Sequence, residues 1–322
     1  MQRYFLSLVL LFFFMQHDLK GQLSGFGPGY QASLARNPGI TGSAGDGHLR
    51  LSYLNLYPGS AYDLHSASVS FDGFFPSIHG GAGFFISNEY LGGIVNDLKA
   101  GFSYSYFFQA GRNMWFSAGL SASFYHRGFS TGGIVLPDQI DPLRGSVLPS
   151  GESLAQEGRT VFDIGAGFVF YSGKFSGGLA VNHLAEPDLS LNDLRKGKLG
   201  RTLFMHLAGN FENGVSNKLS VLPLLTAEVQ KGCFSGAAGA AISLNHLSFN
   251  AMLLTGNGRY MDLQSGFSVG AGVVSLFYNY RFNIISGESL LPFSLQHHTG
   301  MALRLNNVDK RKIIKTIKFP IL

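Results

Sequence analysis

The sequence holds few residues whose type and spacing would suit catalysis. A serine hydrolase carries its nucleophile in a Gly-x-Ser-x-Gly elbow between a strand and a helix, and no elbow in that setting is found here. His183, His206 and His246 lie in or beside expected strands without an acid–base partner nearby in the sequence. Nucleophilic catalysis needs a side chain and its base within hydrogen-bond reach. We therefore expect neither catalytic residues nor an enzyme.

Metal and nucleotide sites are not indicated either. His297 and His298 are adjacent, and adjacent residues of a strand point to opposite faces, so the pair would not bind one ion in an extended segment. The glycine-rich stretch at residues 25–29 has neither the preceding strand nor the following helix that a nucleotide-binding loop requires. Cys233 is the only cysteine, so neither an internal disulfide nor a cysteine metal cluster is expected. We predict no cofactor and no metal.

The composition indicates that lipid, rather than water, covers much of the surface. Charged residues make up 13% of the chain, aromatic residues another 13%, and 43 of the 322 residues are glycine. A soluble domain carries a surface richer in lysine and glutamate. Beyond the N-terminus no stretch approaches the roughly 20 apolar residues of a membrane helix. Since only helices and closed barrels satisfy their backbone in lipid, we predict one all-β domain, a transmembrane antiparallel β-barrel.

The two ends of the chain differ from the body between them. Residues 1–21 have the basic start, the apolar core and the small final residue of a secretory signal peptide; a membrane anchor is the alternative, although the core is short for one. Residues 22–47 are predicted to be a periplasmic N-terminal segment, too short for a folded plug domain. The barrel is expected over residues 48–306, followed by a basic periplasmic tail at residues 307–322.

Alternation of apolar and polar residues is the main structural signal. About fourteen segments of this kind run from near His48 to near Asn306, each long enough for a tilted transmembrane strand, and an even number is usual in single-chain bacterial barrels. The pattern predicts lipid-facing side chains at Leu98, Phe102, Leu120, Leu276 and Tyr278, and lumen-facing side chains at Lys99, Ser103, Ser121 and Asn279.

The lengths of the connections indicate which way the barrel faces. Counted from the first strand, several odd connections are long, such as residues 128–158 and 284–296, whereas the even ones, such as residues 111–113 and 245–246, are short. Outer-membrane barrels pair short periplasmic turns with longer outer loops. We therefore expect an outer-membrane location with both termini in the periplasm.

Several motifs follow one another along the chain in a fixed order. They are Asn37, Pro38 and Gly42 within residues 36–43, a glycine-rich strand and turn at residues 80–92, an Asp-Pro pair at residues 138–142, the Asp-x-Gly-x-Gly-x-x-x-Tyr pattern of residues 163–171, and a strand ending in His-Leu at residues 175–184. In order and spacing they resemble the PorP/SprF family of type IX secretion-system membrane proteins. The chain departs from the family's Asn-Pro-Ala-x-Ala-Gly motif at Gly39 and Thr41, where alanine is usual.

The resemblance implies that the protein assists the export or surface anchoring of secreted proteins in Bacteroidota-type bacteria. Its implied partners are type IX secretion components, a secreted surface protein and outer-membrane lipid. A passive channel for small or apolar molecules remains the alternative, because a polar lumen would suffice for it. A nucleic-acid partner is not expected, since basic residues are not clustered over a folded face.

Two basic features are candidate contact sites. Arg50 and Arg304 each lie between leucines on the first and last strands, so we predict that both point inward and form a basic patch in the periplasmic mouth that binds carboxylates. The alternative is that each lines a wet wall or pairs with a lumen acid. The tail is expected to dock on the inner leaflet or on an acidic partner, although terminal segments are often disordered. Its cations are Lys310, Arg311, Lys312, Lys315 and Lys318.

Overall fold

The structure is a computed structural model that describes residues 33–305, except residues 57, 59–63, 93, 112, 130–136, 142, 147–157, 191–196, 214–218, 258–259 and 286–295. The expected signal peptide, Asn306 and the basic tail with Lys310, Arg311, Lys312, Lys315 and Lys318 lie outside the described residues. Within the described part of the chain, no helix is long and apolar enough to cross a membrane.

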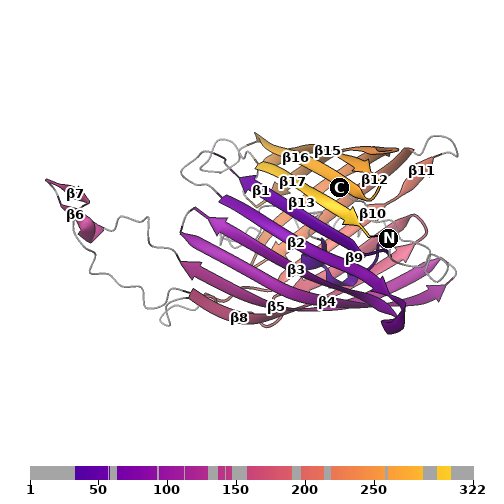
Figure 1. The fold of residues 1–322 in the computed structure, drawn as a ribbon, viewed down its shortest axis with the longest axis horizontal. Helices are drawn as coiled ribbons and strands as arrows, with labels where there is room; N and C mark the ends of the chain where they lie inside the picture. The colour runs from indigo at the N-terminus through magenta and orange to yellow at the C-terminus, as the bar shows by residue number, and fades with distance from the viewer. Residues whose placement is uncertain are drawn as a thin grey trace, which may run out of the picture.

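Fourteen antiparallel strands of the described residues form one barrel, whose strands run obliquely side by side in Figure 1. The predicted fold class and strand number are therefore confirmed. In chain order the strands are β1 (His48–Leu56), β2 (Leu64–Phe75), β3 (Gly80–Leu91), β4 (Val95–Gly111), β5 (Met114–Phe129), β8 (Gly158–Ser172), β9 (Phe175–Asn182), β10 (Thr202–Gly209), β12 (Leu219–Gln230), β13 (Cys233–Leu244), β14 (Leu247–Gly256), β15 (Met261–Ala271), β16 (Val274–Ile285) and β17 (Gln296–Arg304).

The barrel closes where the first strand pairs with the last. β1 and β17 are antiparallel, in a register that sets His48 opposite Arg304 and Leu56 opposite Gln296. β11 (Phe211–Asn213) pairs with β12, as β10 does, so β10 and β11 together supply one barrel strand that is interrupted at Asn210. Closure leaves no open sheet edge in the lipid, which is the condition for a β-structure to span a membrane.

On β4 and β5 the alternating pattern places large apolar side chains outside and mostly small polar ones inside. Phe102 and Leu120 are 73% and 64% exposed on the outer face, whereas Ser103 and Ser105 are buried on the inner face. Lys99 points inward, with its ammonium 5.4 Å from the ring of Phe85 on β3. The predicted separation of Lys99 from Phe102 is therefore confirmed.

The remaining described elements are short. β6 (Ile140–Asp141) and β7 (Gly145–Ser146) pair as a small hairpin in the connection between β5 and β8, after the 3-10 turn η4 (Pro137–Gln139). The 3-10 turn η3 (Pro76–Ile78) links β2 to β3. The helical turn α2 (Ser33–Arg36) and the 3-10 turn η2 (Pro38–Ile40) precede β1, and they form the start of the candidate site.

Candidate functional site

Residues 33–47, which we name the lumen segment, lie inside the barrel. The turn η2 packs against β4, β5, β8 and β9, and in Figure 1 the indigo turns of the segment lie between the near and far walls. The sequence predicted a periplasmic segment here, and the position of residues 33–47 differs from that expectation. The reason is that the segment does not fold as a plug of its own: several of its polar groups form hydrogen bonds with inward-facing residues of the wall.

The outer part of the lumen segment, by which we mean its N-terminal residues up to Ile40, is fixed by Arg36. Its guanidinium forms an ion pair with Glu228 on β12 and lies 5.8 Å from the centre of the Phe204 ring on β10. The side-chain amide of Asn182 on β9 donates a hydrogen bond to the Arg36 carbonyl at 2.7 Å. Three neighbouring strands of one wall therefore hold this single residue.

The Asn37-Pro38 turn fits against inward-facing glycines. The Asn37 side chain is fully buried, and its Oδ1 accepts a hydrogen bond from the Gly39 amide at 2.9 Å. A Cβ atom on Gly167 of β8 would lie 2.0 Å from Asn37 Oδ1, and one on Gly119 of β5 would lie 2.3 Å from the Pro38 carbonyl oxygen. Only glycine permits this close approach, so these wall glycines are part of the site.

The inner part of the segment is fixed by Gly42. Its amide donates to Asp72 Oδ2 on β2 at 2.8 Å, and its φ of +72° favours glycine. Just before it, the Thr41 hydroxyl donates to Ser103 on β4 at 3.0 Å, and the Ser105 hydroxyl donates to the Thr41 carbonyl at 2.6 Å. All three residues of the predicted motif, Asn37, Pro38 and Gly42, are thus brought to one site.

The segment therefore reaches opposite walls of the barrel. β2, which carries the Asp72 contact, is the second of the fourteen strands, and β12, which carries the Glu228 contact, is the ninth. Half of the ring separates them. A segment of fifteen residues thus extends from one side of the lumen to the other.

The two arginines of the predicted basic patch, Arg50 and Arg304, have different surroundings. Arg50 points inward and forms an ion pair with Asp72 at 2.5 Å, so it supports the carboxylate that accepts the Gly42 amide. Arg304 lies opposite His48 across the closing pair of strands, and its side chain is exposed. The contact of Arg50 with Asp72 therefore matches the alternative given above, in which the arginine pairs with an acid of the lumen.

A cavity of about 150 Å³ lies beside the outer part of the segment. It is lined by Arg36 and Glu228, by serines of β1 and β2 such as Ser68, and by Lys99 and Glu89. Charged groups of both signs and hydroxyl groups therefore meet at this point of the lumen.

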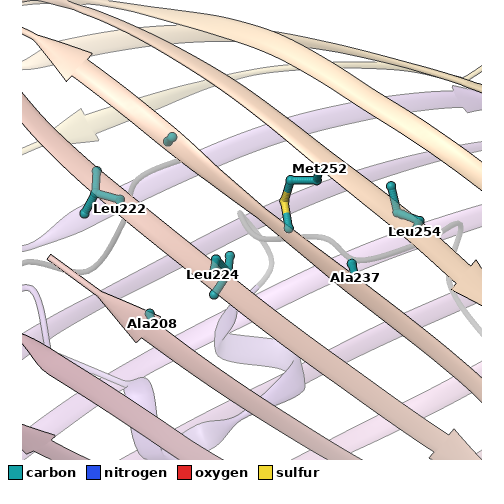
Figure 2. Close-up of a cluster of buried hydrophobic side chains, with 7 residues drawn as sticks. Ala208, Leu222, Leu224, Ala237, Met252 and Leu254 are labelled. Atoms are coloured by element: carbon teal, nitrogen blue, oxygen red, sulfur yellow. The ribbon is translucent and has the colours of Figure 1, made fainter.

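The wall from β10 to β14 is chemically different. Since Glu228 points into the lumen, the other even-numbered residues of β12 do too, and the strand register carries this facing to the neighbouring strands. The resulting inward cluster is apolar and buried, and Figure 2 labels six of its members across these strands. We name it the apolar wall; it comprises Ala208, Leu222, Leu224, Ala237, Ala241, Met252 and Leu254.

Of the histidines considered for chemistry, His183 has an acidic neighbour that its local sequence did not indicate. His183 lies 2.7 Å from Asp163 and is buried. His297 bonds with the Tyr278 hydroxyl at 2.8 Å, whereas His298 packs against the inward ring of Phe277, so the adjacent pair faces opposite ways as expected. Among the described residues, no group of three His, Cys, Asp or Glu side chains is arranged to hold a metal ion.

The residues missed by sequence reasoning are the wall partners of the motif. Arg36 and Glu228 are 192 positions apart, and nothing in the local pattern links them. One signal was present for the glycines: Gly119 and Gly167 occupy inward positions of strongly alternating strands, where glycine is costly unless a backbone must approach closely. That signal indicates a contact without identifying its partner.

Several solved structures are similar to this chain. A monoaromatic hydrocarbon channel, the TodX deltaS2S3 mutant, aligns over 88% of this chain and 95% of its own, with 12% identity and a TM-score of 0.50. The monoaromatic hydrocarbon channel CymD has 13% identity, coverage of 88% and 95%, and a TM-score of 0.49. The toluene transporter TodX of Pseudomonas putida has 12% identity, coverage of 88% and 94%, and a TM-score of 0.48. At such identities the likeness concerns the fold alone.

Sequence comparison identifies the family. No curated protein matches this chain. The family described as type IX secretion system membrane protein PorP/SprF matches residues 30–284, a range that begins just before the lumen segment and runs into β16. Since that match covers most of a closed outer-membrane barrel, the chain belongs to the PorP/SprF family and has an outer-membrane role in type IX secretion.

Proposed function

We propose that this barrel assists the export or surface anchoring of secreted proteins through protein–protein contacts, and that it has no catalytic activity of its own. Its partners are then other type IX secretion components and a secreted surface protein. The observation that carries this proposal is the lumen segment, which reaches from β2 to β12 inside the barrel. A barrel whose interior holds its own chain is better suited to present its two ends to proteins than to conduct solutes.

The apolar wall supports the same proposal. Seven inward side chains between β10 and β14 are apolar and buried, whereas porins line their channels with polar groups and water. The inward face of this wall is apolar rather than polar. Its burial favours a filled interior over a continuous aqueous passage.

The orientation follows from the unequal connections. The connection between β5 and β8 spans residues 130–157, whereas β13 and β14, or β15 and β16, are joined at the opposite end by two residues each; the turn between β12 and β13 is also short but lies at the end of the long connection. The two-residue turns after β4 and after β8 lie at the end of the barrel where β1 begins. Short turns are typical of the periplasmic end of outer-membrane barrels. We propose that both termini are periplasmic and that the longest loops face outward.

Two periplasmic features are proposed as docking points. Arg304 is exposed at the mouth next to the β1–β17 pairing, and with Arg50 it would present positive charge to carboxylates of an acidic loop. The tail at residues 307–322 carries five cations and would bind an acidic secretion component or the inner leaflet. Because Arg50 also holds Asp72, the single change Arg304→Gln tests the patch without disturbing the lumen segment.

The experiment is a comparison of two readouts in the same strain. Deleting the chromosomal copy should remove particular proteins from the cell surface, and a plasmid copy should restore them, as measured by surface proteomics. Purified barrel in liposomes should at the same time show no more sugar influx than empty liposomes. An unchanged surface proteome together with rapid influx would reverse the assignment in favour of the passive channel.

The tail and Arg304 are tested by co-purification at low salt. Truncation after Asn307 should leave a heat-modifiable barrel in the outer membrane but lose periplasmic secretion components from the purified complex. Arg304→Gln should weaken the same association and should leave barrel assembly unchanged. Full retention by both variants would move recognition to the periplasmic turns.

A further inference from the structure

We propose that residues 33–41 form a releasable gate inside the barrel, held shut by the Arg36–Glu228 ion pair and hinged at Gly42 and Gly45. The gate is independent of the secretion role, because it concerns movement within the lumen. It makes one specific claim: residues 33–41 leave the wall, including the Thr41 contacts with β4, while residues 42–47 stay attached.

The inner part is built into the sheet. The Gly47 carbonyl accepts a hydrogen bond from the Leu305 amide at 2.8 Å, and the Gly45 carbonyl accepts one from the Phe74 amide at 3.2 Å. The chain then continues directly into β1 at His48. This end is therefore held by backbone bonds to two strands and by its covalent link to a third, so it is the fixed end of the gate.

The hinge is formed by two glycines with left-handed backbone conformations. Gly42 has φ of +72° and Gly45 has φ of +82°, and a Cβ atom on Gly42 would lie 2.5 Å from Gly81 Cα. Conformational changes concentrate in a few residues that absorb large φ and ψ changes. Rotation about these two glycines would let the gate move while the Gly42 amide and the Gly45 carbonyl keep their hydrogen bonds to Asp72 and Phe74.

The arm of the gate is held by polar contacts and by three buried apolar side chains. These are Leu34, Pro38 and Ile40, and Ile40 packs in one cluster with Val169. Local opening of a short segment exposes less apolar surface than global unfolding and therefore costs less free energy. In the described structure, the buried Asn37 Nδ2 also has no hydrogen-bond acceptor. Leaving such a group unsatisfied costs about 1–3 kcal/mol, and release of the arm into water would remove that cost.

The latch is the ion pair at the far end of the arm. Arg36 and Glu228 retain only 19% and 14% side-chain exposure, so breaking the pair leaves a charge in a poorly hydrated place. The cavity of about 150 Å³ borders both residues, which gives a charged group entering from the lumen access to the latch. A partner that competes for either charge would open the gate.

The test uses the full-length chain in planar lipid bilayers. Glu228→Gln should raise the time spent in a conducting state at least tenfold over wild type, because the arm loses its charged contact. The matched control is Asp97→Asn, which breaks a comparable pair between wall strands, Asp97 on β4 and Arg127 on β5 at 2.6 Å. That control should conduct as wild type does.

Two further variants test whether the ion pair itself, rather than a change in the wall, keeps the gate shut. Arg36→Gln breaks the latch from the arm and leaves the wall unaltered, so it should conduct like Glu228→Gln while keeping the heat-modifiable mobility of a folded barrel. The double exchange Arg36→Glu with Glu228→Arg should restore closure. Wild-type conductance of the single variants, failure of the exchange to close the barrel, or failure of Arg36→Gln to assemble would each overturn the gate.

Discussion

The two sides of the lumen use different chemistry on the same inner face. On the side from β2 to β9, inward positions that contact the lumen segment carry serine, aspartate and glycine, such as Ser105 and Gly167, beside a buried apolar cluster that includes Ile40 of the segment. On the side from β10 to β14, they carry residues such as Leu224 and Met252. The interior of this barrel is therefore not chemically uniform. Most contacts of the lumen segment come from the side from β2 to β9, which we name the polar wall, whereas the apolar wall is a cluster of seven residues, and the segment meets β10 and β12 through Arg36 alone among the contacts described above.

The largest expected effect comes from placing a charge on the apolar wall. Met252 is 1% exposed, so Met252→Lys would bury an ammonium without a partner and should lower the free energy of unfolding by about 3–5 kcal/mol. Ser68→Lys on the polar side borders the cavity and should cost far less. Urea unfolding followed by the fluorescence of Trp115, the only tryptophan, measures both; equal losses would remove the distinction between the walls.

A second variant tests how closely the polar wall fits the segment. Gly167→Val places atoms where Asn37 Oδ1 now lies, 2.0 Å from the position of a Cβ, and should cost about 1–3 kcal/mol or displace the segment. Gly270→Val is the control, because the nearest atom to a Cβ there is 3.8 Å away. Limited proteolysis near residues 33–47 measures displacement, and similar digestion of the two variants would contradict the fit.

How much of this comparison could be foreseen depends on the range of the interactions. The strands, their number and the facing of Lys99 and Phe102 followed from a local period of two. The position of the lumen segment did not, because its contacts join residues such as Gly42 and Asp72, or Arg36 and Glu228, across long sequence separations. The apolar wall was hidden as well, since Leu222 to Leu225 is apolar on both faces and obscures the alternation.

A third variant probes the link between Arg50 and the segment. Asp72→Ala removes the partner of Arg50 and the acceptor of the Gly42 amide together, and hydrogen bonds to charged groups contribute about 1.5–3 kcal/mol each. We expect a loss near the middle of that range, because water partly replaces the carboxylate. The Trp115 unfolding curve measures it, and an unchanged midpoint would show that Asp72 does not hold the segment.

The smallest effect is expected at Thr41. Thr41→Val keeps the shape of the side chain but removes the hydroxyl that forms hydrogen bonds with the Pro38 carbonyl and with the Ser103 hydroxyl. The net cost of losing a neutral hydrogen bond is about 1 kcal/mol, so the unfolding midpoint should fall slightly. A loss as large as that of Met252→Lys would mean that the polar wall, too, behaves as a core.

Hydrogen–deuterium exchange of residues 33–47 in the lipid-embedded, full-length protein tests the central claim most directly. Amides of this segment such as those of Gly42 and Ser43 donate to Asp72 and to the Ile40 carbonyl inside the barrel. They should exchange at least about 100-fold more slowly than in an unstructured peptide of the same sequence. Exchange of the whole segment at the unstructured rate would contradict its place in the lumen.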